Sequence, residues 1–191
     1  NNMVQPDDVP RFSGKIYDES QRLITLVGDI IKLSQLDSKE VAVPFEDIDL
    51  YDTCAAVISH LEMAAAKRKV TVSLTGEHIV IHSAEQIAEE MIFNLCDNAI
   101  KYNRIGGTVE VSLRQCLDGV ELTVRDTGIG IADADLPHIF ERFFRVDKSH
   151  SKAIGGTGLG LSIVKHGARF LGASVSVEST PDVGTTVRVL F

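Results

Sequence analysis

The stretch of this sequence that decides its fold is Asn94-Leu95-Cys96-Asp97-Asn98-Ala99-Ile100-Lys101-Tyr102. On a helix, Asn94 and Asn98 share one face with either Lys101 or Tyr102. Carboxamide oxygens can ligate Mg²⁺, amide N–H groups can contact phosphate, and lysine offers a positive point charge. This face therefore suits an oxygen-rich ligand accompanied by a hard cation. Taken alone, the stretch is equally compatible with the polar outer face of an ordinary helix, because asparagine is common near helix ends.

A second informative segment, Asp126-Thr127-Gly128-Ile129-Gly130-Ile131, comes directly after a predicted strand. Glycines let the backbone approach a flat ligand closely. The Asp126 carboxylate can accept a hydrogen bond from an exocyclic amine such as that of adenine. A plain turn at the end of a hairpin has a similar composition, since Asp and Gly are common in turns.

The third segment is Phe140-Glu141-Arg142-Phe143-Phe144-Arg145. Its phenylalanines predict an apolar anchor that holds the segment on the core. Arg142 and Arg145 can form charge-assisted hydrogen bonds with phosphate. The alternative is an ordinary amphipathic turn with no ligand.

The fourth segment, Gly155-Gly156-Thr157-Gly158-Leu159-Gly160-Leu161-Ser162, opens a predicted helix. Glycines leave backbone N–H groups free to face an anion, and the helix N-terminus adds positive partial charge. The segment is not a Walker A loop, because no Lys-Ser or Lys-Thr pair closes it. It is not a dinucleotide-binding fingerprint either, since it does not follow the first strand of a βαβ unit.

Around these segments the pattern predicts an α+β fold, with helices on one face of a sheet. Residues 127–157 are expected to be long and irregular, with one short helical stretch at 132–140. The helix that carries Asn94 is predicted to begin at a capping residue, Ser83. The other expected helices are 51–69 and 158–171, and the expected strands are 44–50, 70–74, 79–81 (beside 70–74), 108–113, 119–124, 173–178 and 185–191.

The N-terminal part of the chain is predicted to form one long helix from about Arg11 to Gln35. Its apolar positions follow a heptad seam, which is typical of packing between helices and predicts a bundle. The alternative is that this helix packs on the rest of the same chain. The seam consists of Ile16, Ser20, Leu23, Val27, Ile30 and Ser34.

Composition narrows the possible classes of protein. The net charge of −8 argues against a nucleic-acid-binding surface, which needs clustered Lys and Arg. The three cysteines form no CxxC pair, so they are expected to be reduced and mostly buried, and not to bind a metal. Neither a membrane-spanning run nor a signal peptide is expected. The opening Asn1-Asn2-Met3 favours a longer natural protein.

Together the four segments resemble the N, G1, F and G2 boxes of the sensor histidine kinases, in the ATPase superfamily that also includes gyrase and the mismatch-repair ATPases. The resemblance covers roughly residues 44–191, and it implies a Bergerat-type sandwich of helices on one face of a mixed sheet. The first helix, with Glu19-Ser20-Gln21-Arg22-Leu23, is similar to the second helix of the dimerisation hairpin in that family. The implied domains are therefore 1–40, an incomplete dimerisation and phosphotransfer hairpin with its linker, and 41–191, the catalytic ATP-binding domain, preceded by one long helix.

The resemblance also implies a role for each matching residue. ATP and Mg²⁺ are the implied ligands: Asn98 would ligate Mg²⁺ with support from Asn94, and Asp126 would bind the adenine amine. Asn94, Lys101 and Arg145 would serve phosphoryl transfer. The remaining implied contacts of the nucleotide are Tyr102, Gly128, Gly130, Ile131, Arg142, Gly156, Thr157, Gly158, Leu159, Gly160 and Leu161. The stretch between Ile131 and Thr157 would be the ATP lid.

The chain departs from the family at the phosphoacceptor, which sits in a motif of the kind His-Glu-Leu-x-Thr-Pro. None of the six histidines matches that motif. The resemblance thus implies a fragment that binds ATP and transfers the γ-phosphoryl group to a histidine absent from these residues, and that should not autophosphorylate alone. The histidines are, from the N-terminus, His60, His78, His82, His138, His150 and His166.

Two alternatives stay open from the sequence. A hydrolysing ATPase would place a glutamate one helical turn before Asn98, where this chain has Asn94, a poor general base. Glu90 lies one further turn back, too far unless the helix shifts. A nucleotide-controlled, non-catalytic scaffold is the other alternative, and the complete set of boxes argues against it.

The implied partners are ATP, the phosphoacceptor helix of its own dimerisation domain, a response regulator, and a second copy in a homodimer. No nucleic acid is expected as a partner. The family resemblance further implies that these residues are the cytoplasmic portion of a membrane-anchored parent protein.

Overall fold

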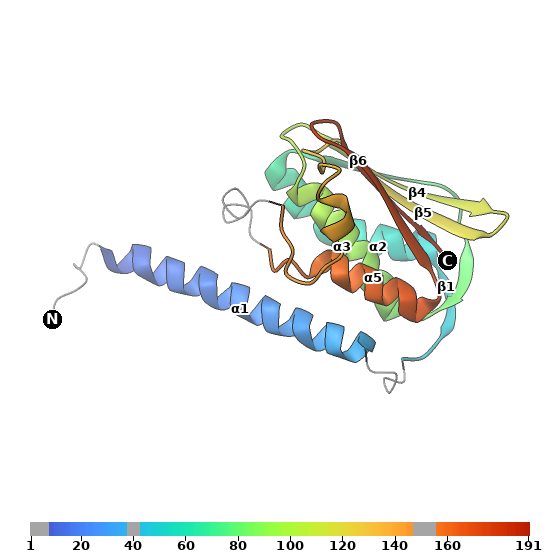
Figure 1. Cartoon of the computed structure of the whole chain (residues 1–191), viewed down its shortest axis with the longest axis horizontal. Coiled ribbons are helices and arrows are strands. Elements are labelled where there is room, and N and C mark those ends of the chain that lie inside the picture. The colour runs from blue at the N-terminus through green and yellow to red at the C-terminus, as the bar shows by residue number, and fades with distance from the viewer. Residues whose placement is uncertain (1–7, 38–42, 147–155) are drawn as a thin grey trace.

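The computed structural model describes residues 8–37, 43–146 and 156–191. A compact body of helices and strands follows one long helix, α1 (Val9–Asp37), whose N-terminal half extends beyond that body (Figure 1). Within the described residues, no helix is both long and apolar enough to cross a bilayer.

The body is built on a mixed five-stranded sheet with the order β2-β4-β5-β7-β6. β2 pairs with β4 in parallel, and the other neighbours are antiparallel. Alternate residues of β4 are buried, as expected for a strand with one face on the core. The strands are β2 (Thr71–Thr75), β4 (Thr108–Cys116), β5 (Gly119–Asp126), β6 (Ser174–Thr180) and β7 (Gly184–Leu190).

Three helices cover one face of this sheet: α2 (Leu50–Arg68), α3 (Glu85–Lys101) and α5 (Gly160–Leu171) (Figure 1). α3 packs between α2 and α5 and carries much of the core. The opposite sheet face is polar and holds a shallow hollow lined by charged and hydroxyl side chains, among them Arg125 and Arg188. The predicted α+β arrangement of helices on one face of a mixed sheet is confirmed.

A separate two-stranded sheet joins β1 (Glu46–Asp49) to β3 (Val80–Ser83) in antiparallel register. The expectation that 79–81 would pair beside 70–74 was therefore wrong. The main-chain N–H of Leu50 donates to the carbonyl of Ile79, so the second strand is drawn to the start of α2 and away from β2.

One local prediction about the helices also needs correction. Ser83 ends β3, and the N-cap of α3 is Ala84, whose side chain makes no capping hydrogen bond. In α2, Cys54 and Val57 are among the buried residues, whereas Met63 is exposed.

The irregular segment after β5 contains less helix than predicted. Only a single 3₁₀ turn, Leu136–His138, forms within the stretch 132–140. Pro137 in that turn has no N–H to donate, which disfavours a longer helix at this point. Residues 147–155 of the predicted lid, with Gly155 of the fourth segment and His150, lie outside the described residues.

Among the described residues, α1 contacts the body near its C-terminal end. Leu33 is its one buried residue, and it packs with Leu159 and Ile163 at the start of α5. The apolar seam residues Ile16, Leu23, Val27 and Ile30 stay exposed. The end of α1 thus packs on the same chain, while the seam is left without a partner among the described residues. The predicted boundary between residues 40 and 41 falls outside the described part of the chain.

Candidate functional site

The two asparagines of α3 face the first residue of α5. A methyl group on Gly160 would lie 2.8 Å from Oδ1 of Asn94 and 3.5 Å from Nδ2 of Asn98. Only glycine fits this approach without displacing the Asn94 carboxamide. The structure therefore brings the first and fourth sequence segments together, with Asn94 and Asn98 half-buried at the junction.

The C-terminal end of α3 meets the second segment. The N–H of Ile129 donates to the carbonyl of Tyr102 at 3.1 Å. Gly128 comes so close to the same carbonyl that a Cβ atom there would collide with it. Gly156 lies beside the Tyr102 hydroxyl, since a Cβ atom on Gly156 would be 3.8 Å from the hydroxyl oxygen. Tyr102 thus contacts both glycine-rich segments.

Asp126 ends β5 with its carboxylate turned back on the backbone. Its Oδ1 accepts hydrogen bonds from the N–H groups of Gly128, at 2.8 Å, and Thr185, at 3.2 Å. Burial raises the pKa of the Asp126 carboxyl above its ordinary value, and the two backbone hydrogen bonds act in the opposite direction. The contact with Thr185 joins the second segment to β7, and neither composition nor spacing predicted it.

The rest of the second segment is fixed by the turn between β6 and β7. Gly130 has φ +69°, which favours glycine, and a Cβ there would collide with the carbonyl of Thr180. The N–H of Ile131 donates to Oγ of Ser179 at 2.8 Å. Ser179 was missed by sequence reasoning because it lies far along the chain in an ordinary strand.

The third segment lies against the fourth. The N–H of Phe143 donates to the carbonyl of Gly158 at 2.9 Å, and both residues have positive φ, 65° and 73°. The prediction that the phenylalanines anchor this segment on the core needs correction. Phe143 is 58% exposed, and Ile139 is the buried anchor, at 6%. Ile139 directly follows the short turn Leu136–His138 and is buried, whereas the turn at Phe143 leaves its ring exposed.

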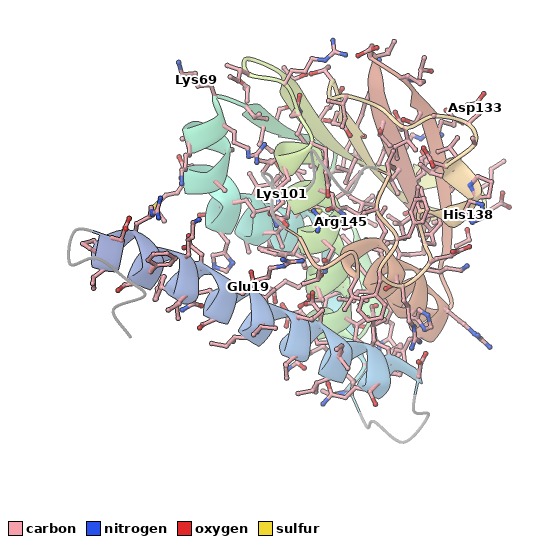
Figure 2. All side chains as sticks on the ribbon, turned by 60° about the vertical axis from the view of Figure 1, so that its left-hand side comes forward. Glu19, Lys69, Lys101, Asp133, His138 and Arg145 are labelled. Carbon is pink, nitrogen blue, oxygen red and sulfur yellow. The ribbon has the colours of Figure 1, made fainter. Side chains whose placement is uncertain are left out.

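The two arginines of the third segment have different partners. Nη1 of Arg145 donates to the carbonyl of Gly156 at 2.8 Å, so Arg145 contacts the fourth segment. The Arg142 guanidinium instead pairs with Asp37 at the end of α1. Arg145 and Lys101 can be followed in Figure 2. The ammonium group of Lys101 contacts Oδ2 of Asp97, one turn earlier in α3, at 2.6 Å.

The fourth segment also contacts α1. Oγ1 of Thr157 donates to Oδ2 of Asp29 at 2.7 Å and accepts from the N–H of Leu159 at 3.3 Å. The side chain of Leu159 is fully buried with Leu33, while Leu161 is half-buried against the main core. The side chains of both leucines are therefore used in packing, so their backbone groups are the part available to a ligand.

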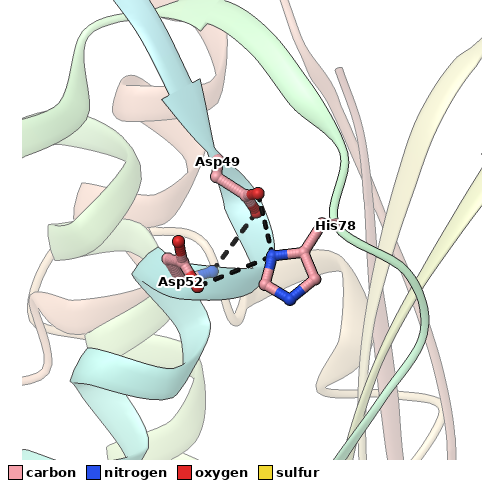
Figure 3. Close-up of side chains that lie close together, drawn as sticks. All are labelled: Asp49, Asp52 and His78. Carbon is pink, nitrogen blue, oxygen red and sulfur yellow. Dashed lines mark hydrogen bonds and ion pairs between the residues drawn. The ribbon is translucent and has the colours of Figure 1, made fainter.

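One group of potential metal ligands lies elsewhere in the described part of the chain, at the start of α2 (Figure 3). Oδ1 of Asp49 accepts from the N–H groups of Tyr51 and Asp52, which caps α2. Its Oδ2 lies 2.9 Å from Nδ1 of His78, whose ring packs on Tyr51. Helix capping and an exposed ion pair account for this cluster.

In the part of the chain that the structure describes, neither buried cysteine offers a nucleophile. Burial raises the pKa of the Cys54 and Cys96 thiols to about 12, so both are neutral at pH 7. His166 pairs with Asp37 at 2.6 Å, and the side chains of His60, His78, His82 and His138 are exposed.

The sequence profile of the family described as "Histidine kinase-, DNA gyrase B-, and HSP90-like ATPase" matches residues 83–191. This chain belongs to that family. The match spans all four segments, and the matched region is an ATP-binding domain of the histidine-kinase type. The family resemblance inferred from the boxes is therefore confirmed.

Within the family, the chain is similar to several sensor kinases. The chain is 39% identical over 184 residues to the sensor-like histidine kinase SenX3 of Mycolicibacterium smegmatis, covering 95% of this chain and 47% of that protein. It is 31% identical over 184 residues to the sensor histidine kinase WalK of Bacillus subtilis, covering 95% of this chain and 30% of WalK. The chain thus spans less than half the length of these relatives.

A solved structure of the mycobacterial sensor histidine kinase MprB has a TM-score of 0.68 at 25% identity, covering 78% of this chain and 97% of that one. These similarities favour the histidine-kinase interpretation over the hydrolysing-ATPase alternative.

Proposed function

We propose that this chain binds ATP with Mg²⁺ and transfers the γ-phosphoryl group to a histidine outside these residues, in a two-component signalling system. The observation that carries the proposal is the convergence of the four segments. Gly160 abuts Asn94 and Asn98, Ile129 bonds to Tyr102, and Phe143 bonds to Gly158. Residues from four separate stretches of sequence thus line one place between α3, β5 and α5.

The polar groups at this place fit a nucleotide. Asp126 is a half-buried acceptor at one end, suited to the exocyclic amine of adenine. Asn94, Asn98 and Lys101 lie along α3 toward the glycine-rich start of α5, whose N-terminal N–H groups suit phosphate. Arg145, beside Gly156, adds positive charge on the same side. In this arrangement, the adenine of ATP would lie near the end of β5 and its phosphates near the start of α5.

The residues present also fit Mg²⁺. Oδ1 of Asn94 lies against Gly160, where a side chain would otherwise fill the space, and Asn98 stands beside it. Neutral carboxamide oxygens together with phosphate oxygens form the hard donor set that Mg²⁺ prefers. Asn98 would hold the ion with support from Asn94, and bound Mg²⁺ would neutralise charge on the transferred phosphoryl group.

In the proposed transfer, the bond between the γ-phosphorus and the bridging oxygen breaks, a phosphorus–nitrogen bond forms on the imidazole, and ADP leaves while the imidazole loses its N–H proton. Lys101 and Arg145 would stabilise the charge on the phosphates. Asn94 stands at the position where hydrolysing relatives would need a base, which favours transfer over attack by water.

The proposed protein partners are inferred from the exposed surface of α1. Its exposed apolar seam, with Ile16 67% exposed, suits a helical bundle with the phosphoacceptor helix and with a second copy. A response regulator would receive the phosphoryl group from that histidine. We place these residues in the cytoplasmic portion of a membrane-anchored parent, as in sensor kinases.

Calorimetric titration of the full chain with ATP, with and without Mg²⁺, tests the nucleotide site. We expect saturable, Mg²⁺-dependent binding that Asn98→Ala weakens on the order of 10- to 100-fold, because a contact to charged phosphate or metal is lost. Gln86→Ala is the matched control, since Gln86 is an exposed carboxamide in the first turn of the same helix. Absence of binding by a protein that unfolds cooperatively would refute the proposal.

Transfer is tested by adding a histidine-bearing dimerisation hairpin from a related sensor kinase. We expect an acid-labile label from γ-labelled ATP on the hairpin and none on this chain alone. Release of inorganic phosphate without a labelled hairpin would instead support the hydrolysing ATPase.

A further inference from the structure

Glu90 lies between α1 and the nucleotide site, one turn before Asn94 in α3. Its Oε2 lies 2.7 Å from the ammonium group of Lys32 on α1. Its Oε1 accepts a hydrogen bond from Nδ2 of Asn94 at 3.1 Å. Both carboxylate oxygens therefore have partners, one on each side, and the side chain bridges two helices that are far apart in sequence.

The same contacts fix the direction of the Asn94 carboxamide. Its Nδ2 donates to the main-chain carbonyl of Glu90 at 2.8 Å as well as to Oε1. An amide nitrogen has two hydrogens to donate, so both are used. The oxygen of the carboxamide must then point the other way, and Oδ1 is indeed the atom that lies against Gly160. Without the Glu90 side chain, only the main-chain carbonyl of residue 90 would remain to favour this orientation over the flipped one.

Lys32 belongs to a row of α1 residues that all contact the body on one side. Asp29 accepts from Thr157 in the fourth segment, and Leu33 packs on α5. Asp37 pairs with both Arg142 and His166. Because these positions are spaced by three or four residues, they share one helical face. The pairing of Lys32 with Glu90 therefore depends on how α1 is docked.

We propose that Glu90 is a positioning residue that orients the Asn94 carboxamide toward the metal and phosphate side of the site, and that Lys32 makes this orientation depend on docking of α1. This proposal rests on the proposed function, because a bound nucleotide with Mg²⁺ is what defines the metal and phosphate side of the site. It assigns Glu90 no role as a base, since both of its carboxylate oxygens already have partners.

The first test measures ATP affinity with and without Mg²⁺ in variants of the full chain. Glu90→Leu is expected to reduce the gain in affinity that Mg²⁺ provides by roughly 5- to 20-fold, with Mg²⁺-free affinity changed less than about threefold. Glu90→Gln keeps an acceptor for Asn94 and is expected to restore most of the gain. Lys32→Met should give an intermediate loss.

Lys15→Met is the matched control for Lys32→Met, because Lys15 is an exposed lysine of α1 with no partner in the described part of the chain. Loss of affinity in Glu90→Leu that is equal with and without Mg²⁺ would overturn the positioning role. An unchanged Mg²⁺ gain in Lys32→Met would overturn the link to α1.

A second measurement needs no nucleotide. The side-chain NH₂ resonances of Asn94 should exchange slowly with water in the wild type and in Glu90→Gln, and quickly in Glu90→Leu. Fast exchange in the wild type would overturn the proposal directly. If this measurement succeeds but the wild type binds no ATP, the proposed function fails while the positioning of Asn94 stands.

Discussion

The helices α3 and α1 differ in how they are held. α3 has 17 residues and buries side chains along its whole length, from Ile87 to Ile100. α1 has 29 residues and buries Leu33 alone among its described residues. α3 is therefore inseparable from the fold, whereas α1 is attached at one end by ion pairs and a small apolar cluster. The contrast teaches that the residues of the nucleotide site on α3 are placed by the core, while their connection to α1 can be broken without unfolding the body.

The largest expected effect comes from comparing a buried position in α3 with an exposed position in α1. Ile92→Ala in α3 removes a fully buried side chain and should lower the free energy of unfolding by about 2–5 kcal/mol. Ile24→Ala in α1, where the side chain is 65% exposed, should change it by less than about 0.5 kcal/mol. Urea unfolding followed by circular dichroism measures both. Similar losses would show that α1 is part of the core.

A second variant breaks the attachment of α1 alone. Leu33→Ala should undock α1 from α5 at a cost of roughly 2 kcal/mol in docking free energy, because Leu33 is the buried centre of that contact. Hydrogen exchange should then quicken at the start of α5 but not in the middle of α3. Leu23→Ala, at an exposed seam position, is the control and should leave both regions protected.

Acid should weaken the attachment of α1. The hydrogen bond from Arg142 lowers the pKa of the Asp37 carboxyl, with His166 adding to the effect. A lowered carboxyl pKa contributes stability that is present above the ordinary value and is lost as pH falls through the lowered pKa. Docking of α1, followed by hydrogen exchange, should therefore weaken below about pH 4 in the wild type. Asp37→Asn should show weaker docking at neutral pH and little further change.

At Asp126 in the body, a lower pH should increase stability rather than decrease it. This is the smallest expected effect. Burial raises the pKa of Asp126, so its contribution is greatest below the ordinary carboxyl value and is lost as pH rises through the raised pKa. The melting temperature of the wild type, relative to Asp126→Asn, should fall as pH rises from about 4 to 7. A constant difference would contradict the burial of a charged carboxylate.

The sequence predicted the body well because its signals are local. Alternation in β4 and β5 around Asp118-Gly119, and the glycines before α5, specify neighbouring elements that the structure confirms. The error in strand pairing arose where a distant contact decides. β3 pairs with β1 because Leu50 bonds to Ile79, and no short-range pattern encodes that choice between two edges.

The candidate site was predictable as a set of residue types, but not as a network. The chemistry of Asn94, Asn98 and Asp126 follows from their side chains, and their roles stay predictions. Glu90, itself paired with Lys32, holds Asn94, and Thr185 holds Asp126. Such partners are ordinary charged or hydroxyl residues at unremarkable positions, so only three-dimensional proximity identifies them.

α1 is attached to the body along its C-terminal part, from Asp29 to Asp37, so the rest of the helix forms a long arm. Leu33 and Val9 are 24 positions apart (33 − 9) in one continuous helix, which corresponds to about 36 Å. Pivoting α1 by ~10° about Leu33 would carry its N-terminal end by ~6 Å, while Lys32, one residue from the pivot, would move by a small fraction of an ångström. A displacement applied at the far end would therefore reach the contact between Lys32 and Glu90 greatly reduced, as a small change in its length.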